Sequence, residues 1–164
     1  MFNFVKSFLF SLVIVAISIF AMVMIEKIDL YFDIKKFDSN INITAGLVFL
    51  LLGVIFRVWA AWTFYQNRLK VITLTPQHTF VKSGLYSFSR NPLYLGIVGI
   101  AFGSALLFGS LIGVICAILI FISWHMYVKF VEEKRLEKKF GESYIRYKQE
   151  VPRWLGFKHK KNGA

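Results

Sequence analysis

The sequence predicts an all-α, polytopic membrane protein with about four membrane-spanning helices, formed as a single domain over residues 1–164. Three observations predict it. First, 57% of the residues are hydrophobic and 18% are aromatic. Second, several apolar stretches approach the roughly 20 residues that a helix needs to cross a bilayer. Third, the net charge of +11 is gathered in the segments between these stretches, whereas a soluble domain alternates apolar and polar residues more often.

The four spans are expected at about residues 4–25, 43–65, 93–108 and 111–131. The first holds 18 uncharged residues from Phe8 to Ile25, which is long for a signal peptide, and no small-x-small cleavage site follows it. Residues 26–42 are expected to form a polar loop. A fifth half-span inside residues 66–92 is the alternative to a four-span topology.

The third and fourth spans are predicted to form a tight hairpin that turns at Gly109-Ser110. The third span is short and carries Gly96, Gly99 and Gly103. Small residues at spacings of three and four allow two membrane helices to approach closely. The hairpin is therefore expected to be buried in the bundle.

A helical tail, residues 132–164, is predicted to follow the fourth span in the cytosol. Nothing breaks the helix over residues 111–140, and Gly141 is suited to end it. A second short helix over residues 142–150 is expected next, before a proline. Its tyrosines offer an apolar edge that can fold back as a cap.

The placement of charge predicts the orientation. Residues 66–92 carry four basic and no acidic residues, and the tail from Lys129 onward carries 11 basic and 5 acidic ones. The positive-inside rule then places both segments and the N-terminus in the cytosol, where they contact anionic membrane lipids. This placement argues against a nucleic-acid partner. The compact size favours a prokaryotic inner membrane.

No metal site is expected, because the single cysteine, Cys116, and the three histidines show no metal-ligand spacing. Instead, two polar clusters flank the predicted hairpin, at residues 78–94 and at Glu132-Glu133. Both ends of the hairpin face the cytosol, so the clusters are expected to converge on one site. Their tyrosines, arginine and glutamates suit a zwitterionic, partly aromatic ligand that also carries a positive charge.

Arg90, Glu133 and Arg57 are the candidate catalytic residues, on the substrate side of the site. Each also has a structural interpretation. Taken alone, Arg90 is typical of a lipid-phosphate contact, and Glu133 of a solvated helix face that pairs with Arg135 or Lys139. Arg57 lies inside the second span, where a charge is either functional or structurally paired. The joint order and spacing favour a functional site.

The polar clusters are made of short sequence pieces. These are His78-Thr79-Phe80-Val81, Ser83-Gly84-Leu85-Tyr86 and Arg90-Asn91-Pro92-Leu93-Tyr94, then Glu132-Glu133, Leu136, Phe140-Gly141, Tyr144, Tyr147 and Val151-Pro152-Arg153. In this order and spacing they resemble the isoprenylcysteine carboxyl methyltransferases and their relatives, the phospholipid N-methyltransferases. The resemblance covers about residues 66–155.

The resemblance implies a multi-span enzyme that uses S-adenosyl-L-methionine as its methyl donor. It implies cofactor contacts from His78, Thr79, Phe80, Val81, Tyr86, Asn91, Pro92, Leu93, Tyr94 and Glu132, with Gln66 as a weaker match. The implied partner is a lipophilic small-molecule or lipidated substrate. The methyl acceptor would be the carboxylate of a prenylated cysteine-like substrate or a lipid amine.

Two positions depart from the pattern of this family. Asn91 stands where many members have histidine, so no proton transfer is expected there. Val128 stands where the isoprenylcysteine enzymes carry a substrate-binding arginine, which weakens the case for carboxyl methylation. Two alternatives stay open: an NADPH-dependent, sterol-reductase-like membrane enzyme, and a non-enzymatic membrane protein that retains the scaffold.

Overall fold

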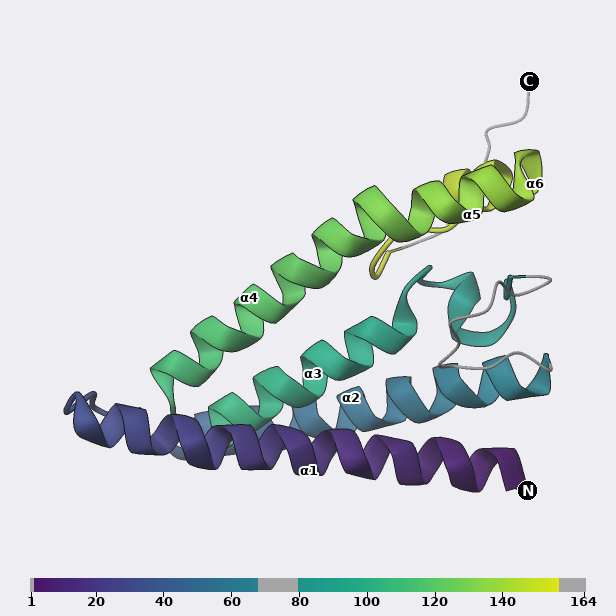
Figure 1. The fold of residues 1–164 in the computed structure, drawn as a ribbon. Helices are drawn as coiled ribbons and strands as arrows, with labels where there is room; N and C mark the ends of the chain where they lie inside the picture. Colours follow the sequence, from purple (N-terminus) through teal and green to yellow (C-terminus); the bar gives the residue numbers. More distant parts are fainter. Residues whose placement is uncertain (1, 68–79, 157–164) are drawn as a thin grey trace.

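The structure is a computed structural model that describes residues 2–67 and 80–156 (Figure 1). The described part consists of helices and connecting segments and contains no β-strand. The helices are α1 (Phe2–Tyr31), α2 (Asn40–Gln66), α3 (Pro92–Leu107), α4 (Leu111–Tyr127), α5 (Glu133–Phe140) and α6 (Glu142–Glu150), with a 3-10 turn η1 (Gly84–Ser87) and a π-helical turn η2 (Val128–Glu132). The predicted all-α class is confirmed.

Three helical stretches are long and apolar enough to cross a membrane: Phe8–Tyr31, Asn40–Phe64 and Leu111–Phe140. Large apolar side chains are exposed along all three, including Ile17, Leu51 and Leu119, as a lipid-facing surface requires. Helix α3 is apolar but has only 16 residues. That is about 24 Å of helix, against a hydrocarbon core of roughly 30 Å. The chain is a polytopic helical membrane protein, and a fourth full span at α3 stays a prediction.

Helix α1 is longer than the expected span, because it continues to Tyr31 through residues that were predicted to lie in a loop. Asp29, in its last turns, is only 1% exposed. It accepts a hydrogen bond of 2.5 Å from Ser110 Oγ, and Ser110 Oγ in turn accepts one of 2.9 Å from Gly113 N at the start of α4. This buried contact ties the end of α1 to the bundle, so the prediction of a polar loop from residue 26 was wrong.

The small residues of α3 pack against α2, which corrects the expectation that they line a hairpin with the fourth span. A Cβ atom added to Gly103 would lie 2.5 Å from Leu50 N, and one added to Gly53 would lie 2.6 Å from Ile100 N. Such distances mean that the backbones of α2 and α3 are nearly in contact. Helix α4 does follow α3 through the expected turn at Gly109, which has a φ of +60°. In Figure 1, however, α4 diverges from α3 beyond that turn.

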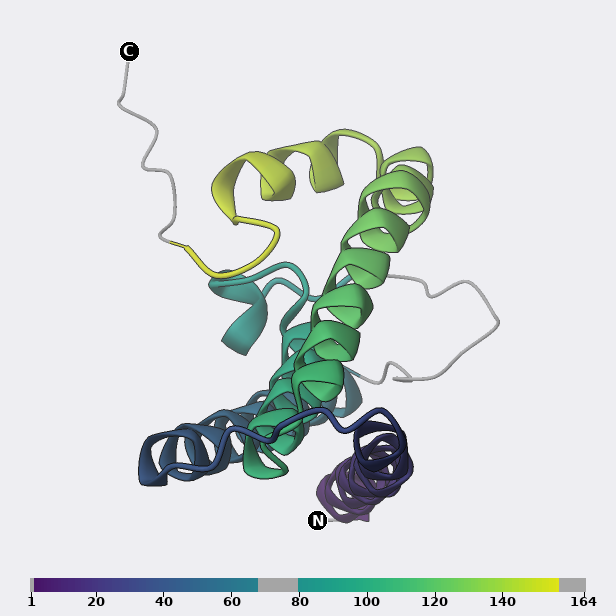
Figure 2. The same cartoon turned by 90° about the vertical axis from the view of Figure 1, so that its left-hand side faces the viewer.

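The long fourth helix and the folded-back tail agree with the prediction. The helical path runs from α4 through η2 and α5 to Phe140, Gly141 has a φ of +51°, and α6 follows. Figure 2 shows α6 and the segment after it turned back toward η1. The buried cluster of Tyr144, Tyr147 and Val151 packs against Phe80 and the aliphatic and aromatic side chains of α5. The tail therefore covers the end of the bundle at which α3 begins.

Candidate functional site

The start of α3 meets the end of the long fourth helix at Tyr94. Its hydroxyl donates a hydrogen bond of 2.8 Å to Glu132 Oε2. Its ring stacks on Trp124 of α4, with 4.3 Å between ring centroids and 26° between ring planes. The carboxylate of Glu132 and the stacked rings of Tyr94 and Trp124 thus lie side by side. This is the convergence of the two polar clusters that the sequence predicts.

A π-helical turn places the paired glutamates. Over η2 the helix widens, and Glu133 N donates to Val128 O, five residues earlier. Within this turn Glu132 contacts Tyr94, while Glu133 contacts Arg90. Single π-helical turns are frequent at functional sites because they redirect side chains within an otherwise regular helix. Val128, which the family pattern marks as an arginine position, is 1% exposed.

Glu133 is the centre of a buried network of charges. It is 2% exposed. Arg153 donates two hydrogen bonds to it, from Nε to Oε1 and from Nη2 to Oε2, each of 2.8 Å. Arg90 Nη1 also lies 2.8 Å from Oε1, and Lys148 Nζ lies 3.8 Å from Oε2. One carboxylate therefore faces three cations, and removing it would leave buried charge without compensation.

Arg90 enters this network by charge more than by hydrogen bonding. Its Nη1 is close to Glu133, yet neither Nε nor Nη1 makes a well-directed hydrogen bond among the described residues. Tyr144 lies against the same pair. Burial, and then the negative charge of Glu133, raises the pKa of the Tyr144 hydroxyl to about 12, although Arg90 acts in the opposite direction. This tyrosine therefore remains neutral at physiological pH.

The tail is held to the segment before α3 by hydrogen bonds. Tyr147 Oη donates to Tyr86 O at 2.7 Å. Arg90 N donates to Pro152 O at 3.0 Å, and Asn91 Nδ2 donates to Arg153 O at 3.1 Å. These bonds join residues 86–91 to residues 147–153, so the two segments form one unit.

The structure brings most of the predicted cofactor residues near this unit. Val81 and Tyr86 are buried against α2, and Leu93 packs beside them. Phe80 belongs to the tail cluster, with its ring 5.3 Å from that of Tyr144. Pro92 is the first residue of α3. His78 and Thr79 lie outside the described residues, and the side chain of Gln66, at the end of α2, is exposed.

The candidate catalytic residues fall into two places. Arg90 and Glu133 lie together in the charge network, where they contact each other. Arg57 lies apart from them on α2 and is 2% exposed. Its Cζ is 4.9 Å from the centroid of the Phe10 ring on α1. Its Nε and Nη1 have no hydrogen-bond partner among the described residues.

Several contributors were not predicted from the sequence. Arg153 was noted only as part of a motif, yet it donates hydrogen bonds to Glu133. Trp124 stacks on Tyr94. Trp154 Nε1 donates to His125 Nδ1 at 3.0 Å. His125 is therefore hydrogen-bonded to the tail. The sequence feature that could have indicated a role for Arg153 is the motif Val151-Pro152-Arg153, which the family resemblance includes.

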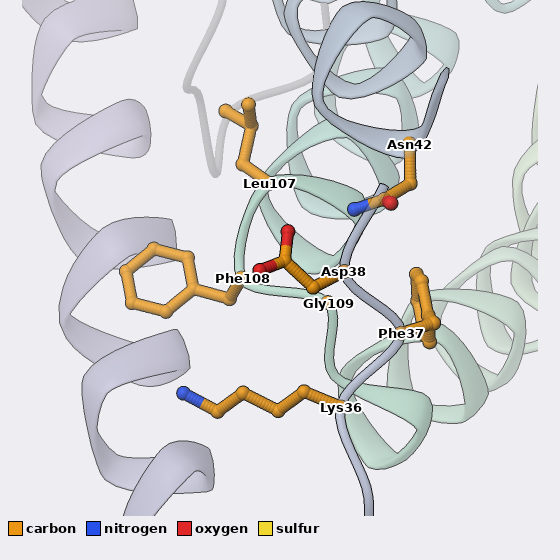
Figure 3. Close-up of a pocket in the computed structure, with 7 residues that line it drawn as sticks. All are labelled: Lys36, Phe37, Asp38, Asn42, Leu107, Phe108 and Gly109. Carbon is orange, nitrogen blue, oxygen red and sulfur yellow. The ribbon is translucent and has the colours of Figure 1, made fainter. Parts of the chain in front are cut away.

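A hollow of about 370 Å³ lies elsewhere in the molecule (Figure 3). Its lining residues come from the connection between α1 and α2, from the start of α2, and from the end of α3 and the turn after it: Lys36, Phe37, Asp38, Asn42, Leu107, Phe108 and Gly109. None of the candidate site residues borders it. Tyr94, in contrast, lies at the opposite end of α3, near its first residue.

The fold and the site together define a polytopic helical membrane protein in which the start of α3, the π-helical turn and a folded-back tail form one polar and aromatic cluster. The chain belongs to the phospholipid methyltransferase family, whose model matches residues 41–143. The resemblance seen in the sequence is thus confirmed at the level of the family.

Individual relatives agree. A protein-S-isoprenylcysteine O-methyltransferase from Xenopus laevis is 33% identical over 119 residues, which cover 68% of this chain and 40% of the relative. The protein of that name from Saccharomyces cerevisiae is 32% identical over 130 residues, which cover 74% of this chain and 54% of the relative. The one from Rattus norvegicus is 31% identical over 118 residues, which cover 69% of this chain and 40% of the relative. The chain thus spans about half the length, or less, of these relatives.

Proposed function

We propose that this chain is a membrane methyltransferase that uses S-adenosyl-L-methionine and transfers a methyl group to a lipophilic acceptor. The observation that carries the proposal is the Tyr94–Glu132 hydrogen bond beside Trp124, in a chain of the phospholipid methyltransferase family. The names of the relatives support methyl transfer to a prenylated cysteine as one form of this activity.

The chemistry of the cluster fits the proposed cofactor. S-adenosyl-L-methionine supplies, when bound, a methyl group on a positively charged sulfonium. Cations are stabilised by aromatic faces and by carboxylates. Glu132 offers the carboxylate, and the stacked rings of Tyr94 and Trp124 offer the aromatic faces. Tyr86, Asn91 and the other contacts implied by the resemblance complete the proposed binding segment.

The remaining residues are proposed to position the site and to exclude water. The network of Glu133, Arg90 and Arg153 holds the tail over residues 80–91, and a closed site strengthens the electrostatic interactions inside it. For Arg90 and Glu133, their mutual contact favours this positioning role over the direct substrate contact expected from the sequence. Arg57, whose Nε and Nη1 have no hydrogen-bond partner among the described residues, keeps its proposed role on the substrate side.

We propose the orientation that the charges predict, with both termini in the cytosol of a prokaryotic inner membrane. Arg90, shortly before α3, and Pro152 of the tail lie at the same end of the bundle, because Arg90 N donates to Pro152 O. Cofactor then enters from the cytosol and the acceptor from the bilayer. Cysteine accessibility to a membrane-impermeant reagent, with single cysteines at Lys36 or Lys138, tests this orientation.

The function is tested by methyl transfer from methyl-labelled S-adenosyl-L-methionine in membranes that contain the protein. Two acceptors are compared: N-acetyl-S-farnesylcysteine and phosphatidylethanolamine. A methyl ester releases its label as methanol in base, whereas an N-methyl group does not. Base-labile label in the first acceptor supports carboxyl methylation, stable label in the second supports amine methylation, and label in neither contradicts the proposed function.

A further inference from the structure

The segment after α6 does not stay at the end of the molecule at which α6 lies, but runs back beside α4 (Figure 1). Trp154 Nε1 donates to His125 Nδ1 at 3.0 Å. The Trp154 ring also packs against Phe121, with 5.1 Å between the ring centroids. The end of the tail therefore contacts two successive turns of α4, both of which come before the π-helical turn.

The position of these contacts along α4 gives their depth in the membrane. Helix α4 begins at Leu111, after a turn that lies beside Lys36 and Asp38 in the hollow, so this turn marks one membrane surface. His125 lies 14 residues after Leu111, about 21 Å along the helix, whereas the hydrocarbon core is roughly 30 Å thick. His125 and the indole of Trp154 thus lie within the hydrocarbon, about 9 Å below the surface on the side of α6.

Helix α3 gives a second measure of this depth. Arg90 N donates to Pro152 O at 3.0 Å, and Asn91 Nδ2 donates to Arg153 O at 3.1 Å. Asn91 directly precedes α3, whose 16 residues extend about 24 Å from the same turn. Pro152 and Arg153 are therefore also inside a core of roughly 30 Å.

Apolar side chains at this level are open to lipid. Ile122 and Met126, in the turns of α4 that the tail reaches, are 46% and 53% exposed. Leu155, next to Trp154, is 63% exposed. An exposed leucine at hydrocarbon depth contacts acyl chains, so the end of the tail continues the lipid-facing surface of α4.

The polar groups of the tail end are matched at this depth. Non-helical backbone is tolerated within hydrocarbon where protein partners satisfy it. The carbonyls of Pro152 and Arg153 accept the two bonds described above, and the N–H of Trp154 is bonded to His125. The charge of Arg153 is paired with Glu133 through two hydrogen bonds, as an intramembrane charge requires.

We propose that residues 152–155 form a re-entrant anchor, a segment that inserts into the leaflet on the side of the candidate site and takes its acyl chains as partner. This inference goes beyond the proposed function and depends only on the membrane-spanning fold. It changes the expectation for residues 152–155, which were predicted to lie in the cytosol with the rest of the tail. The tail is then held over the start of α3 both by the Glu133 network and by the bilayer.

The test is the environment of a bimane label at single cysteines in the full chain, in phosphatidylcholine vesicles and with Cys116→Ser as the background. Lipids brominated in their acyl chains quench a label in hydrocarbon, and iodide quenches a label in water. Brominated lipid should quench Leu155→Cys as strongly as Ile122→Cys, and several-fold more strongly than Ser143→Cys at an exposed position of α6. Iodide should give the reverse order. Iodide quenching of Leu155→Cys as strong as that of Ser143→Cys overturns the inference.

A second measurement needs no variant to fold. In hydroxyl-radical footprinting of the wild type in the same vesicles, Leu155 should be oxidised as slowly as Ile122. It should be oxidised several-fold more slowly than Ile145, an exposed aliphatic residue of α6. Oxidation of Leu155 at the rate of Ile145 would place the end of the tail in water and overturn the anchor.

Discussion

Tyr94 in the first turn of α3 and Glu132 in the π-helical turn η2 are joined by a hydrogen bond of 2.8 Å across 38 residues of sequence. The bond links the two polar clusters that flank the apolar pair of α3 and α4. It also places a carboxylate beside two stacked rings, an arrangement that suits a cation. The proposed cofactor site depends on this pair.

Removing only the Tyr94 hydroxyl should weaken cofactor binding without unfolding the protein. In Tyr94→Phe the ring still stacks on Trp124, but Glu132 loses its donor and its orientation. A hydrogen bond to a charged group contributes about 1.5–3 kcal/mol, so affinity for S-adenosylhomocysteine should fall roughly tenfold or more. Calorimetric titration measures it. Tyr31→Phe, at an exposed tyrosine, is the matched control, and equal affinities of all three proteins would contradict the assignment.

The charge network should contribute strongly to stability. In Glu133→Gln, Arg90 and Arg153 lose their shared counter-charge, and breaking a buried ion pair costs about 3–5 kcal/mol. For a chain of this length, the melting temperature should fall by roughly 6–20 °C. Thermal unfolding in detergent measures the change. Glu142→Gln, at an exposed glutamate of α6, is the control and should have the melting temperature of the wild type. An unchanged melting temperature in Glu133→Gln would mean that the network does not contribute to stability.

Alkaline pH should separate the wild type from Tyr144→Phe. Burial and Glu133 raise the pKa of Tyr144 to about 12, whereas an unfolded tyrosine titrates near 10. The unfolded state therefore loses its proton first, and the stabilisation from neutral Tyr144 is complete below pH ~10 and is lost as pH rises to ~12. Between pH ~10 and pH ~12, the free energy of unfolding of the wild type should fall by about 2–3 kcal/mol more than that of Tyr144→Phe. Denaturant unfolding at both pH values measures this difference, and parallel losses would refute it.

The close contact of α2 and α3 predicts unequal effects of glycine substitutions. A Cβ at Gly103 would lie 2.5 Å from Leu50 N, a backbone atom that cannot move independently, so Gly103→Ala should force the helices apart. In Gly113→Ala the atom nearest to the added Cβ is Met22 Sδ, at 2.9 Å, and that flexible side chain can shift. Thermal unfolding should show the larger loss for Gly103→Ala, typically 1–3 kcal/mol for overpacking. Equal losses would contradict the observed helix pairing.

The sequence predicts much of this fold because its signals are local. Gly141 and the later proline bound the short helix α6, and hydrophobic length marks the long helices. The partner of the small-residue face of α3 was predicted wrongly, since glycine spacing indicates a close approach but not which helix approaches. The burial of Asp29 was missed for a similar reason: its partner Ser110 is 81 residues away.

For the site, too, some features could be predicted from the sequence and others could not. The convergence of Tyr94 with Glu132 follows from topology, because both ends of the apolar pair lie at one end of the bundle. The bidentate contact of Arg153 with Glu133 does not follow, because an arginine in an irregular tail has no periodicity that gives its direction. The π-helical turn is likewise invisible in the sequence, although it decides where the two glutamates point.

Titration of the detergent-purified wild type with S-adenosylhomocysteine, with NADPH as the control ligand, tests the central claim most directly. The account predicts micromolar binding of S-adenosylhomocysteine, its marked weakening in Glu132→Gln, and no binding of NADPH. Folded protein that binds NADPH alone would instead indicate a reductase-like enzyme. Folded protein that binds neither ligand would contradict the assignment of Tyr94 and Glu132 to a cofactor site.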